Sequence, residues 1–275
     1  MSVPLRLEAP AKLNLSLRVV GRRDDGLHQL ESDMVLLELA DRLLLMPGCS
    51  GLRVEGSTDG LPLDETNLAW RGLRAGMAGE PDVACLALEK RVPSAAGLGG
   101  GSSDAAAAWR LGRAWRGIGP PATSQERAAL ADIGADVPFF AAGVAAGRVT
   151  GIGEAVEARP GIRQPVVLVH PPLRLSTAAV FAELRPEEWS MLENDLLAPA
   201  RRLAPALDDL FTAVRDAGGT PRMTGSGPTI FSLEEDPERA SAVAGALAHR
   251  GIHATITATR TSPAEIERVD EEEPG

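Results

Sequence analysis

A run of glycines and serines at residues 97–103, GLGGGSS, has the composition of a phosphate-binding loop. Glycine permits positive φ angles and lets backbone N–H groups approach a ligand without obstruction by a Cβ atom. Alanines at residues 105–108 follow, so the loop leads into a helix that Ser102 or Ser103 can cap. The N–H groups of the first turn then lie at the positive end of the helix dipole, and such an end binds phosphate.

The spacing of this loop excludes two common phosphate-binding motifs. A Walker A loop closes with Gly-Lys-Ser/Thr, whereas Gly101 is followed by Ser102, and a Rossmann motif counted from Gly97 requires glycine at position 102. A flexible Gly-Ser linker is the alternative. The flanks argue against a linker, because residues 83–88 are typical of a strand and apolar residues then recur at helical spacing from 107 to 118.

Lysine is rare in this chain. The 28 basic residues include two lysines, Lys12 and Lys90, and the others are arginine. Either lysine is scarce by chance, or these two stand where a compact ammonium group works and a planar guanidinium does not.

Two further polar residues are candidates for chemistry. Asp136 directly precedes an apolar helical stretch, so it is either a helix N-cap or a buried carboxylate that faces a nucleotide. His28 follows the turn GRRDDG at residues 21–26, where it either reads a polar ligand or is a surface histidine without a ligand.

Composition excludes several classes of protein. The chain of 275 residues has a formal net charge of −10, which argues against nonspecific binding to nucleic acid. No stretch is long and apolar enough to span a membrane, and the N-terminus lacks a signal-peptide pattern, so we expect a cytoplasmic protein without membrane contacts. Cys49 and Cys85 lack metal-ligand spacing, and we expect both to be reduced and structural, with no zinc or iron–sulfur site and no metal ligands among the protein's own residues.

The pattern of elements predicts two domains of an α+β protein. Strands are expected at residues 5–20, interrupted at Pro10, and at residues 30–39, 42–46 and 52–55, followed by a helix that Thr66 caps. After residue 158 the order of predicted strands and helices is ferredoxin-like. Residues 270–275 are acidic and are expected to be disordered.

Three segments together resemble the motifs of the GHMP small-molecule kinases: PAKLNL near the N-terminus, PSAAGLGGGSSDAA in the middle and TGSGPT near the C-terminus. Their order and separation make the combination specific. Further segments, GADVPFF, HPPLRLSTAAVF and ENDL, are similar to the branch that phosphorylates the 2-hydroxyl of 4-diphosphocytidyl-2-C-methyl-D-erythritol in isoprenoid precursor synthesis. The resemblance runs from about residue 8 to residue 235.

The resemblance implies a fold and a catalytic pair. Residues 1–158 would form an ATP-binding domain like domain 2 of ribosomal protein S5, and residues 159–275 a ferredoxin-like domain with an acidic tail. Asp136 would accept the proton of the attacked hydroxyl, and Lys12 would orient that hydroxyl and lower its pKa.

The resemblance also assigns binding residues. For ATP, with Mg²⁺ as its expected companion, they are Pro93, Ala95, Ala96, Gly97, Leu98, Gly99, Gly100, Gly101, Ser102 and Ser103 around the phosphates and Lys90 and Asn67 near the adenosine. Asp104 would either reach magnesium through a water or favour the helix start. For the acceptor they are Asn14, His28, Phe181, Thr224, Gly225, Ser226 and Gly227.

At one position the chain departs from the pattern. Leu27 stands where a tyrosine usually forms the second side of a stack on the cytosine, so the chain loses about 1–2 kcal/mol of stacking. A GHMP kinase for another small alcohol, such as homoserine or mevalonate, and a non-catalytic nucleotide sensor therefore remain as alternatives. A monomer and a homodimer are both compatible with the sequence.

Overall fold

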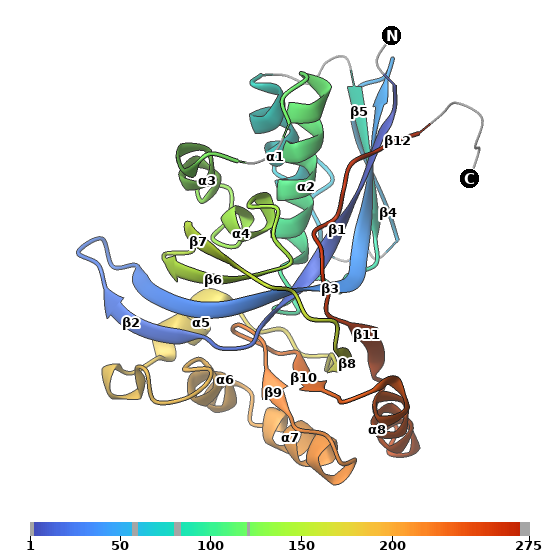
Figure 1. Ribbon diagram of the computed structural model, residues 1–275. Coiled ribbons are helices and arrows are strands. Elements are labelled where there is room, and N and C mark those ends of the chain that lie inside the picture. Colours follow the sequence, from blue (N-terminus) through green and yellow to red (C-terminus); the bar gives the residue numbers. More distant parts are fainter. Residues whose placement is uncertain (1–2, 57–59, 80–83, 120–121, 270–275) are drawn as a thin grey trace.

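Two β-sheets, one above the other in Figure 1, divide the protein. The structure is a computed structural model, and it describes residues 3–56, 60–79, 84–119 and 122–269. The first sheet contains β1 Leu5–Asn14, β2 Arg18–Arg22, β3 His28–Pro47, β4 Gly51–Gly56, β5 Ala84–Lys90, β6 Ala146–Gly151, β7 Ala155–Arg159 and β12 Glu267–Arg268. The second sheet contains β8 Pro165–Val169, β9 Arg222–Met223, β10 Ile230–Leu233 and β11 Thr255–Ala258.

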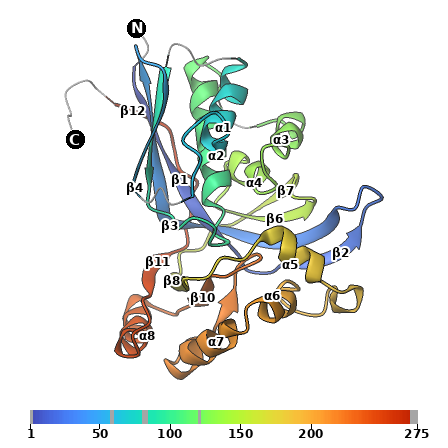
Figure 2. The ribbon, with the colours of Figure 1, turned by 180° about the vertical axis from the view of Figure 1, so that it is seen from behind.

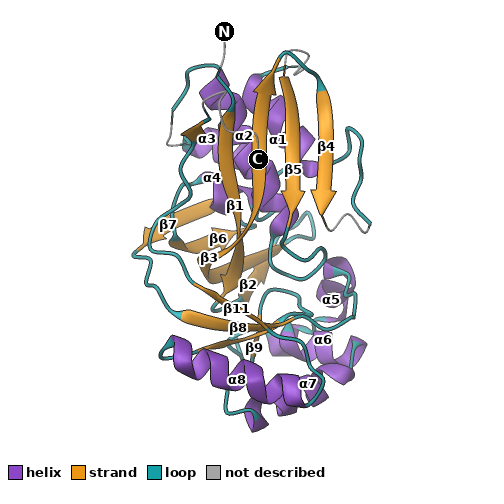
Figure 3. Cartoon of the chain, turned by 90° about the vertical axis from the view of Figure 1, so that its right-hand side faces the viewer, coloured by secondary structure: helices purple, strands orange, loops and turns teal. Residues whose placement is uncertain are grey.

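Each sheet has its own helices. Those of the first are α1 Leu68–Met77, α2 Gly100–Trp115, α3 Ser124–Leu130 and α4 Val137–Ala141. Those of the second are α5 Thr177–Glu183, α6 Leu197–Leu203, α7 Ala206–Asp216 and α8 Pro237–His249, with a 3₁₀ turn at Pro186–Glu188. Figure 3 shows α1 and α2 behind the strands of the upper sheet and α7 and α8 below the lower one. In the part of the chain that the structure describes, no helix has the length and apolarity to cross a bilayer.

The strand β3 connects the whole first sheet. Two strands were expected between residues 30 and 46, but β3 is continuous for 20 residues and pairs with β1, β2, β5 and β6. The break was expected around the charged residue Asp41. Asp41 is fully buried and its carboxylate accepts hydrogen bonds from the backbone N–H groups of Arg91 and Val92, so the charge marks no turn.

An interruption of the first strand was expected at Pro10, but β1 runs through this residue. The pairing of β1 with β3 shifts register between Pro10 and Lys12, and this irregularity accommodates the residue without an N–H. Beyond it, β1 continues to Asn14. As expected for an extended chain, Lys12 and Asn14 lie on one face, with 2.6 Å between Lys12 Nζ and Asn14 Oδ1.

Two helix starts differ from those expected. The cap of α2 is Gly99, in the left-handed conformation and without a side-chain hydrogen bond, and not Ser102 or Ser103. The cap of α1 is Asn67, whose side chain accepts from the N–H of Ala69, and not Thr66. In α2 the run of glycines lets the helix begin three residues earlier than a cap at Ser102 would allow.

The second sheet is ferredoxin-like, as expected. Its strand order is β11-β8-β10-β9 and its elements follow the order strand, helices, two strands, helix, strand. Strand β8 is buried at every residue because both faces are covered. Val167 and Val169 pack with the helices of this sheet, whereas Val166 and Leu168 pack with Leu98 and residues of the first sheet. The chain then returns to the first sheet, where β12 pairs with β1.

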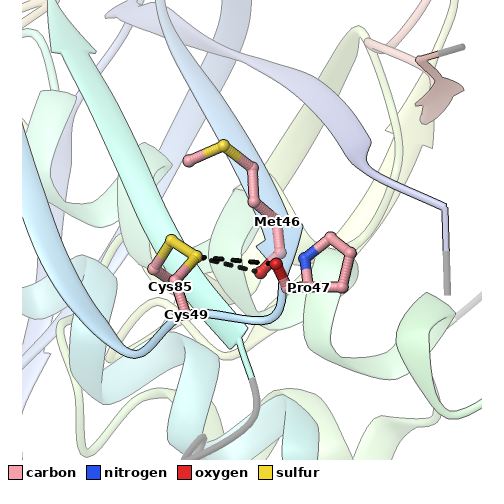
Figure 4. The surroundings of a disulfide bond; sticks show 4 residues. All are labelled: Met46, Pro47, Cys49 and Cys85. Atoms are coloured by element: carbon pink, nitrogen blue, oxygen red, sulfur yellow. Dashed lines mark hydrogen bonds between the residues drawn. A yellow bond between two sulfur atoms is a disulfide. The ribbon is translucent and has the colours of Figure 1, made fainter. Parts of the chain in front are cut away.

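The prediction that both cysteines are reduced is wrong for this structure. Cys49 and Cys85 form a disulfide, with 5.2 Å between their Cα atoms (Figure 4). Cys85 lies opposite Met46 in the pairing of β3 with β5, and Cys49 is three residues beyond Met46. The strand pairing therefore brings together two residues that are 36 positions apart. The expected disordered tail, residues 270–275, lies outside the described residues.

Candidate active site

A cavity of about 510 Å³ lies where the two sheets meet. Strands β1 and β3 contribute to one side of it, the loop before α2 to another, and α5 with the loop after β9 to a third. The predicted site residues that line it are Lys12, Asn14, Lys90, Pro93, Ala95, Ala96, Gly97, Gly99, Gly100, Gly101, Ser102, Asp136, Phe181, Gly225 and Ser226.

The proposed catalytic pair meets in this cavity. Lys12 and Asp136 are 124 positions apart in the chain, yet Lys12 Nζ lies 3.4 Å from Asp136 Oδ2. The lysine side chain is 4% exposed and the aspartate side chain 36%. Asp136 occupies the N-cap position of α4 but makes no capping hydrogen bond with its side chain. Its carboxylate is therefore neither a helix cap nor buried, and it faces the ammonium group from the open side.

The start of α2 opens onto the same cavity. Because Gly99 offers no side-chain acceptor, the N–H groups of the first turn are available to an anion. Gly97 and Gly99 have φ of +74° and +71°, and a Cβ atom on Gly97 would lie 2.8 Å from the carbonyl oxygens of Thr224 and Gly227. Glycine is thus required there by backbone angle and by close packing.

The loop at residues 224–227 completes the surroundings of Lys12. The hydroxyl of Thr224 accepts a hydrogen bond from the backbone N–H of Asn14 at 3.0 Å. A Cβ atom on Gly225 would lie 3.2 Å from Asn14 Oδ1 and 3.4 Å from Lys12 Nζ. The three segments that carry the resemblance are therefore packed against one another.

Lys90 forms the centre of a buried ionic cluster. Its ammonium donates to Asp41 and, at 2.7 Å, to Asp104 Oδ2. All three side chains are at most 5% exposed. Burial, opposed by the charge of Lys90 and reinforced by that of Asp41, raises the pKa of Asp104 well above its usual range. The contact with Lys90 was not foreseen for Asp104.

The other predicted site residues do not line the cavity. Those that are buried without lining it are Leu98, Ser103, Asp104, Asn67, Thr224 and Gly227, and His28 is only partly buried. Leu98 still acts on the site through its backbone, because its carbonyl accepts from the N–H of Lys12 at 2.9 Å. Asn67 caps α1 and donates to the carbonyl of Pro62. Their predicted roles toward ATP or acceptor stay predictions.

His28 and Phe181 come together although they are far apart in sequence. Their rings stack with centroids 5.2 Å apart and an angle of 25° between the planes. Figure 2 shows how this occurs, because α5, which carries Phe181, lies across β2 and β3. Leu27, the residue before His28 that stands where a tyrosine was expected, is 49% exposed.

Three residues with direct effects on the site were not predicted. Ser32 accepts a hydrogen bond from the amide of Asn14 at 2.8 Å, and Asp41 holds Lys90. Asn194 donates to the carbonyls of Met223 and Gly225. Asp41, a charge inside an apolar run, carried a signal in the sequence, whereas Ser32 followed a normal strand alternation.

The fold and the cavity together define a class of small-molecule kinase, and comparison with known proteins agrees. Residues 67–144 match the N-terminal domain of the GHMP kinases and residues 175–253 their C-terminal domain. A solved homoserine kinase from Cytophaga hutchinsonii, 18% identical, shares the fold with a TM-score of 0.65 and covers 97% of this chain and 98% of its own. The chain belongs to the GHMP kinases, which are ATP-dependent phosphotransferases.

Within this class, higher identities point to one branch. The 4-diphosphocytidyl-2-C-methyl-D-erythritol kinase of Paramagnetospirillum magneticum is 39% identical over 267 residues, which is 88% of this chain and 93% of that protein. The same kinase from Thermus thermophilus is 38% identical, over 87% of this chain and 91% of its own. A crystal structure of a 4-(cytidine 5'-diphospho)-2C-methyl-D-erythritol kinase is 35% identical with a TM-score of 0.76, covering 92% of this chain and 98% of that chain. The chain is a member of the 4-diphosphocytidyl-2-C-methyl-D-erythritol kinase family.

Proposed function

We propose that this protein transfers the γ-phosphoryl group of ATP to the 2-hydroxyl of 4-diphosphocytidyl-2-C-methyl-D-erythritol. The observation that carries the proposal is the 3.4 Å contact of Lys12 with Asp136 in a cavity that also contains the open start of α2. The relatives named above support the acceptor. ATP is a cytoplasmic metabolite, and we propose the cytoplasm as the site of action.

The phosphates of ATP would lie at the start of α2. Backbone N–H groups of the first turn and the hydroxyl of Ser102 are suitable donors, and the helix dipole favours negative charge there. Phosphoryl transfer depends on positioning and charge stabilisation more than on covalent chemistry by the protein, and this arrangement provides both.

Lys12 and Asp136 would then act on the attacked hydroxyl. Asp136, whose side chain is 36% exposed, accepts the proton of the acceptor hydroxyl as the hydroxyl oxygen attacks the γ-phosphorus. Lys12 is fixed by Asn14 at 2.6 Å and holds its positive charge beside that oxygen, where negative charge develops.

A divalent cation fits this site when it arrives with the nucleotide. No cluster of three or more histidine, cysteine or acidic side chains that could hold a metal is present among the residues that the structure describes. Magnesium needs no such cluster, because it is usually held by one or two protein oxygens together with phosphates and waters. Ser102 and Asp136 offer such oxygens in the cavity, and bound Mg²⁺ would neutralise the charge of the β- and γ-phosphates.

His28 has the properties needed to read a cytosine edge. Burial, followed by the charge of Arg22, lowers the pKa of His28, so the imidazole is neutral at pH 7. A neutral imidazole has one donor and one acceptor nitrogen. Cytosine presents an amino donor next to a ring acceptor, and a neutral imidazole can accept from the first or donate to the second.

A turnover assay tests the proposal. The protein is incubated with Mg²⁺, ATP and the cytidylyl acceptor, and ADP and phosphorylated acceptor are measured, with homoserine and mevalonate as comparison substrates. We expect ADP release that depends on the cytidylyl acceptor. A folded protein that binds ATP but releases no ADP with this acceptor would show the proposal to be wrong.

Replacement of Asp136 tests the mechanism. Asp136→Asn removes the proton acceptor and should lower kcat by about 10²–10⁴-fold while ATP affinity changes little. The matched control is Asp132→Asn, which changes an exposed aspartate four residues earlier. Normal turnover in Asp136→Asn would return Asp136 to a structural role.

A further inference from the structure

Trp189 is the third ring of an aromatic cluster that also contains His28 and Phe181, beside the cavity that Phe181 lines. Its indole ring contacts the His28 imidazole edge-on, with centroids 5.9 Å apart and an interplanar angle of 85°. On another side the imidazole stacks with Phe181, which lines the cavity. The imidazole thus occupies a place suited to a flat, nitrogen-containing ring, bounded by two aromatic side chains.

The indole of Trp189 carries an unused donor. Its Nε1 is buried and has no hydrogen-bond partner among the described residues. An indole N–H can only donate, and a buried donor without an acceptor is unfavourable. A ligand that brings an acceptor atom to this place would remove that penalty.

The chain holds Trp189 firmly from both sides. Before it, Glu188 accepts hydrogen bonds from Arg202 at 2.5 and 2.9 Å and from the backbone of Arg185. After it, the N–H of Ser190 donates to the buried Asp195 at 2.7 Å, and the Ser190 hydroxyl donates to the carbonyl of Val19. Such anchoring is what a ring that recognises a ligand requires, because a rigid wall loses little entropy on binding.

We propose that Trp189 is a specificity-determining residue of the acceptor site. With Phe181 it forms an aromatic box for the pyrimidine ring of the acceptor, and its N–H donates to the exocyclic carbonyl of that ring. The imidazole of His28 moves from the face of Phe181 to the edge of the base when the base enters. Trp189 thereby adds an aromatic contact perpendicular to the stack on Phe181, which is a different position from the parallel one that Leu27 leaves without a ring.

This inference rests on the proposed function for the identity of the acceptor, but it can be tested without turnover. The chain contains four tryptophans, and the other three, Trp70, Trp109 and Trp115, lie on α1 and α2. Cytidine monophosphate is the probe, because it carries the base and cannot be phosphorylated at the acceptor hydroxyl.

The first experiment is a fluorescence titration. Cytidine monophosphate should change the tryptophan emission of the full chain in a saturable way. Trp189→Phe should abolish this change, and Trp115→Phe, the matched control, should retain it. No saturable change in the unaltered protein, or an equal change in Trp189→Phe, would overturn the proposal.

The second experiment separates binding of the two substrates. Trp189→Ala should raise KM for the cytidylyl acceptor about tenfold, the scale of one lost base–aromatic contact. Trp189→Phe keeps a ring and loses the donor, so it should raise that KM about threefold. Both variants should leave kcat and KM for ATP within about twofold, which a general loss of stability would not do.

The outcomes distinguish this inference from the proposed function. Emission changes that depend on Trp189 in a protein without turnover would leave the box in place and refute the kinase assignment. Turnover with unchanged acceptor KM in both Trp189 variants would support the kinase and overturn the box.

Discussion

The two lysines of this chain are both buried, and each is compensated by oxygens. A buried ammonium group is costly unless it is paired and hydrogen-bonded. Lys12 has Asn14 and Asp136, and its side chain is crowded by glycine, since a Cβ atom at Gly99 would lie 3.0 Å from Lys12 Cγ. An arginine has a larger planar head and would not fit between these neighbours, which explains physically why lysine is kept here.

The cluster around Lys90 makes a prediction about charge. One ammonium faces two carboxylates, and Asp41 also accepts two backbone N–H groups, so Asp41 has more hydrogen-bond donors around it than Asp104. The pKa of Asp104 is raised, mainly by burial, and its Oδ1 has no partner among the described residues. Asp104→Asn replaces a protonated carboxyl by an isosteric neutral group and should change the free energy of unfolding by less than about 1 kcal/mol at pH near 5.

The pH dependence of stability tests whether Asp104 holds a proton in the folded protein. The folded protein holds the Asp104 proton at pH values where the unfolded chain has released it, so the stability of the unaltered protein falls as pH rises through that window. Asp104→Asn has no such proton, so its stability relative to the unaltered protein should increase in urea unfolding as pH rises above the ordinary range of a carboxyl group. Asp41→Asn is the contrast and should cost about 3–5 kcal/mol. If Asp104→Asn instead becomes relatively less stable as pH rises, Asp104 is ionised in the fold.

At the scale of elements, the contact between α1 and α2 sets where the start of α2, the proposed phosphate-binding end, lies. A Cβ atom on Gly72 would lie 2.1 Å from the carbonyl oxygen of Ala105, and one on Gly76 2.3 Å from that of Trp109. Gly72→Ala should therefore separate the helices and cost more than about 2 kcal/mol of unfolding free energy.

A glycine-to-alanine substitution in α8 should change the free energy of unfolding in the opposite direction. Gly245 lies inside α8 with nothing within 4 Å of its Cβ position, so Gly245→Ala should stabilise the protein by about 0.5–1 kcal/mol through helix propensity. Urea unfolding of both variants gives the comparison. Equal effects of the two substitutions would show that the contact between α1 and α2 is not close.

The disulfide joins the connection after β3 to β5, at a distance from the cavity. Neither cysteine lines the cavity, and Cys49 Sγ lies 3.7 Å from the carbonyl oxygens of Met46 and Pro47 (Figure 4). Removal of the cross-link by Cys49→Ser with Cys85→Ala should cost about 2–4 kcal/mol and leave kcat unchanged. Dithiothreitol should lower the unfolding midpoint of the unaltered protein and not that of the double variant. A midpoint that does not respond to reductant would show that the cross-link contributes nothing.

Some local features were predicted from the sequence, whereas the length of β3 and the cysteine pairing were not. The positive φ of Gly97 and Gly99 follows from residue type, although the helix after them begins before the expected serine caps. The shared face of Lys12 and Asn14 follows from the period of an extended chain. By contrast, the length of β3 and the pairing of Cys49 with Cys85 depend on which strands lie side by side, and single-sequence patterns do not contain that register. The break expected between residues 39 and 42 was wrong for the same reason, because Asp41 bonds Lys90 at the end of β5 and the backbone N–H groups of the two residues that follow.

At the scale of the whole molecule, the second sheet completes the cavity in which Lys12 and Asp136, the proposed catalytic pair, meet. Lys12 and Asp136 come from the first half of the chain, but Gly225 and Thr224 of the other half press on Lys12 and Asn14. The sheets are held together by an apolar layer that includes Leu13, Leu98 and Val166, and by Arg260, which donates to Glu8 and to the carbonyl of Leu37. A fixed relation between the sheets is therefore a condition for catalysis.

Asn194 transmits this relation to the site. Its side chain is buried and fully used: the amide donates to the carbonyls of Met223 at 2.8 Å and Gly225 at 2.9 Å, and the oxygen accepts from the N–H of Leu196 at 3.0 Å. Its backbone lies beside Leu17, shortly after β1, in a parallel bridge. Asn194 thus ties the segment that follows β1 to the loop that presses on Lys12.

Asn194→Ala should release the 224–227 loop and shift Lys12 slightly. Phosphoryl transfer is sensitive to small changes in the position of such a group. We expect kcat to fall about 10–100-fold while KM for ATP changes less than about threefold, because the start of α2 is held by other contacts. Val243→Ala is the control, since Val243 is fully buried on α8 among the helices below the second sheet and its truncation costs about 2 kcal/mol. Both are assayed well below their unfolding transitions. A similar loss of kcat in Val243→Ala would mean that general loosening of the second sheet, and not the position of the 224–227 loop, limits catalysis.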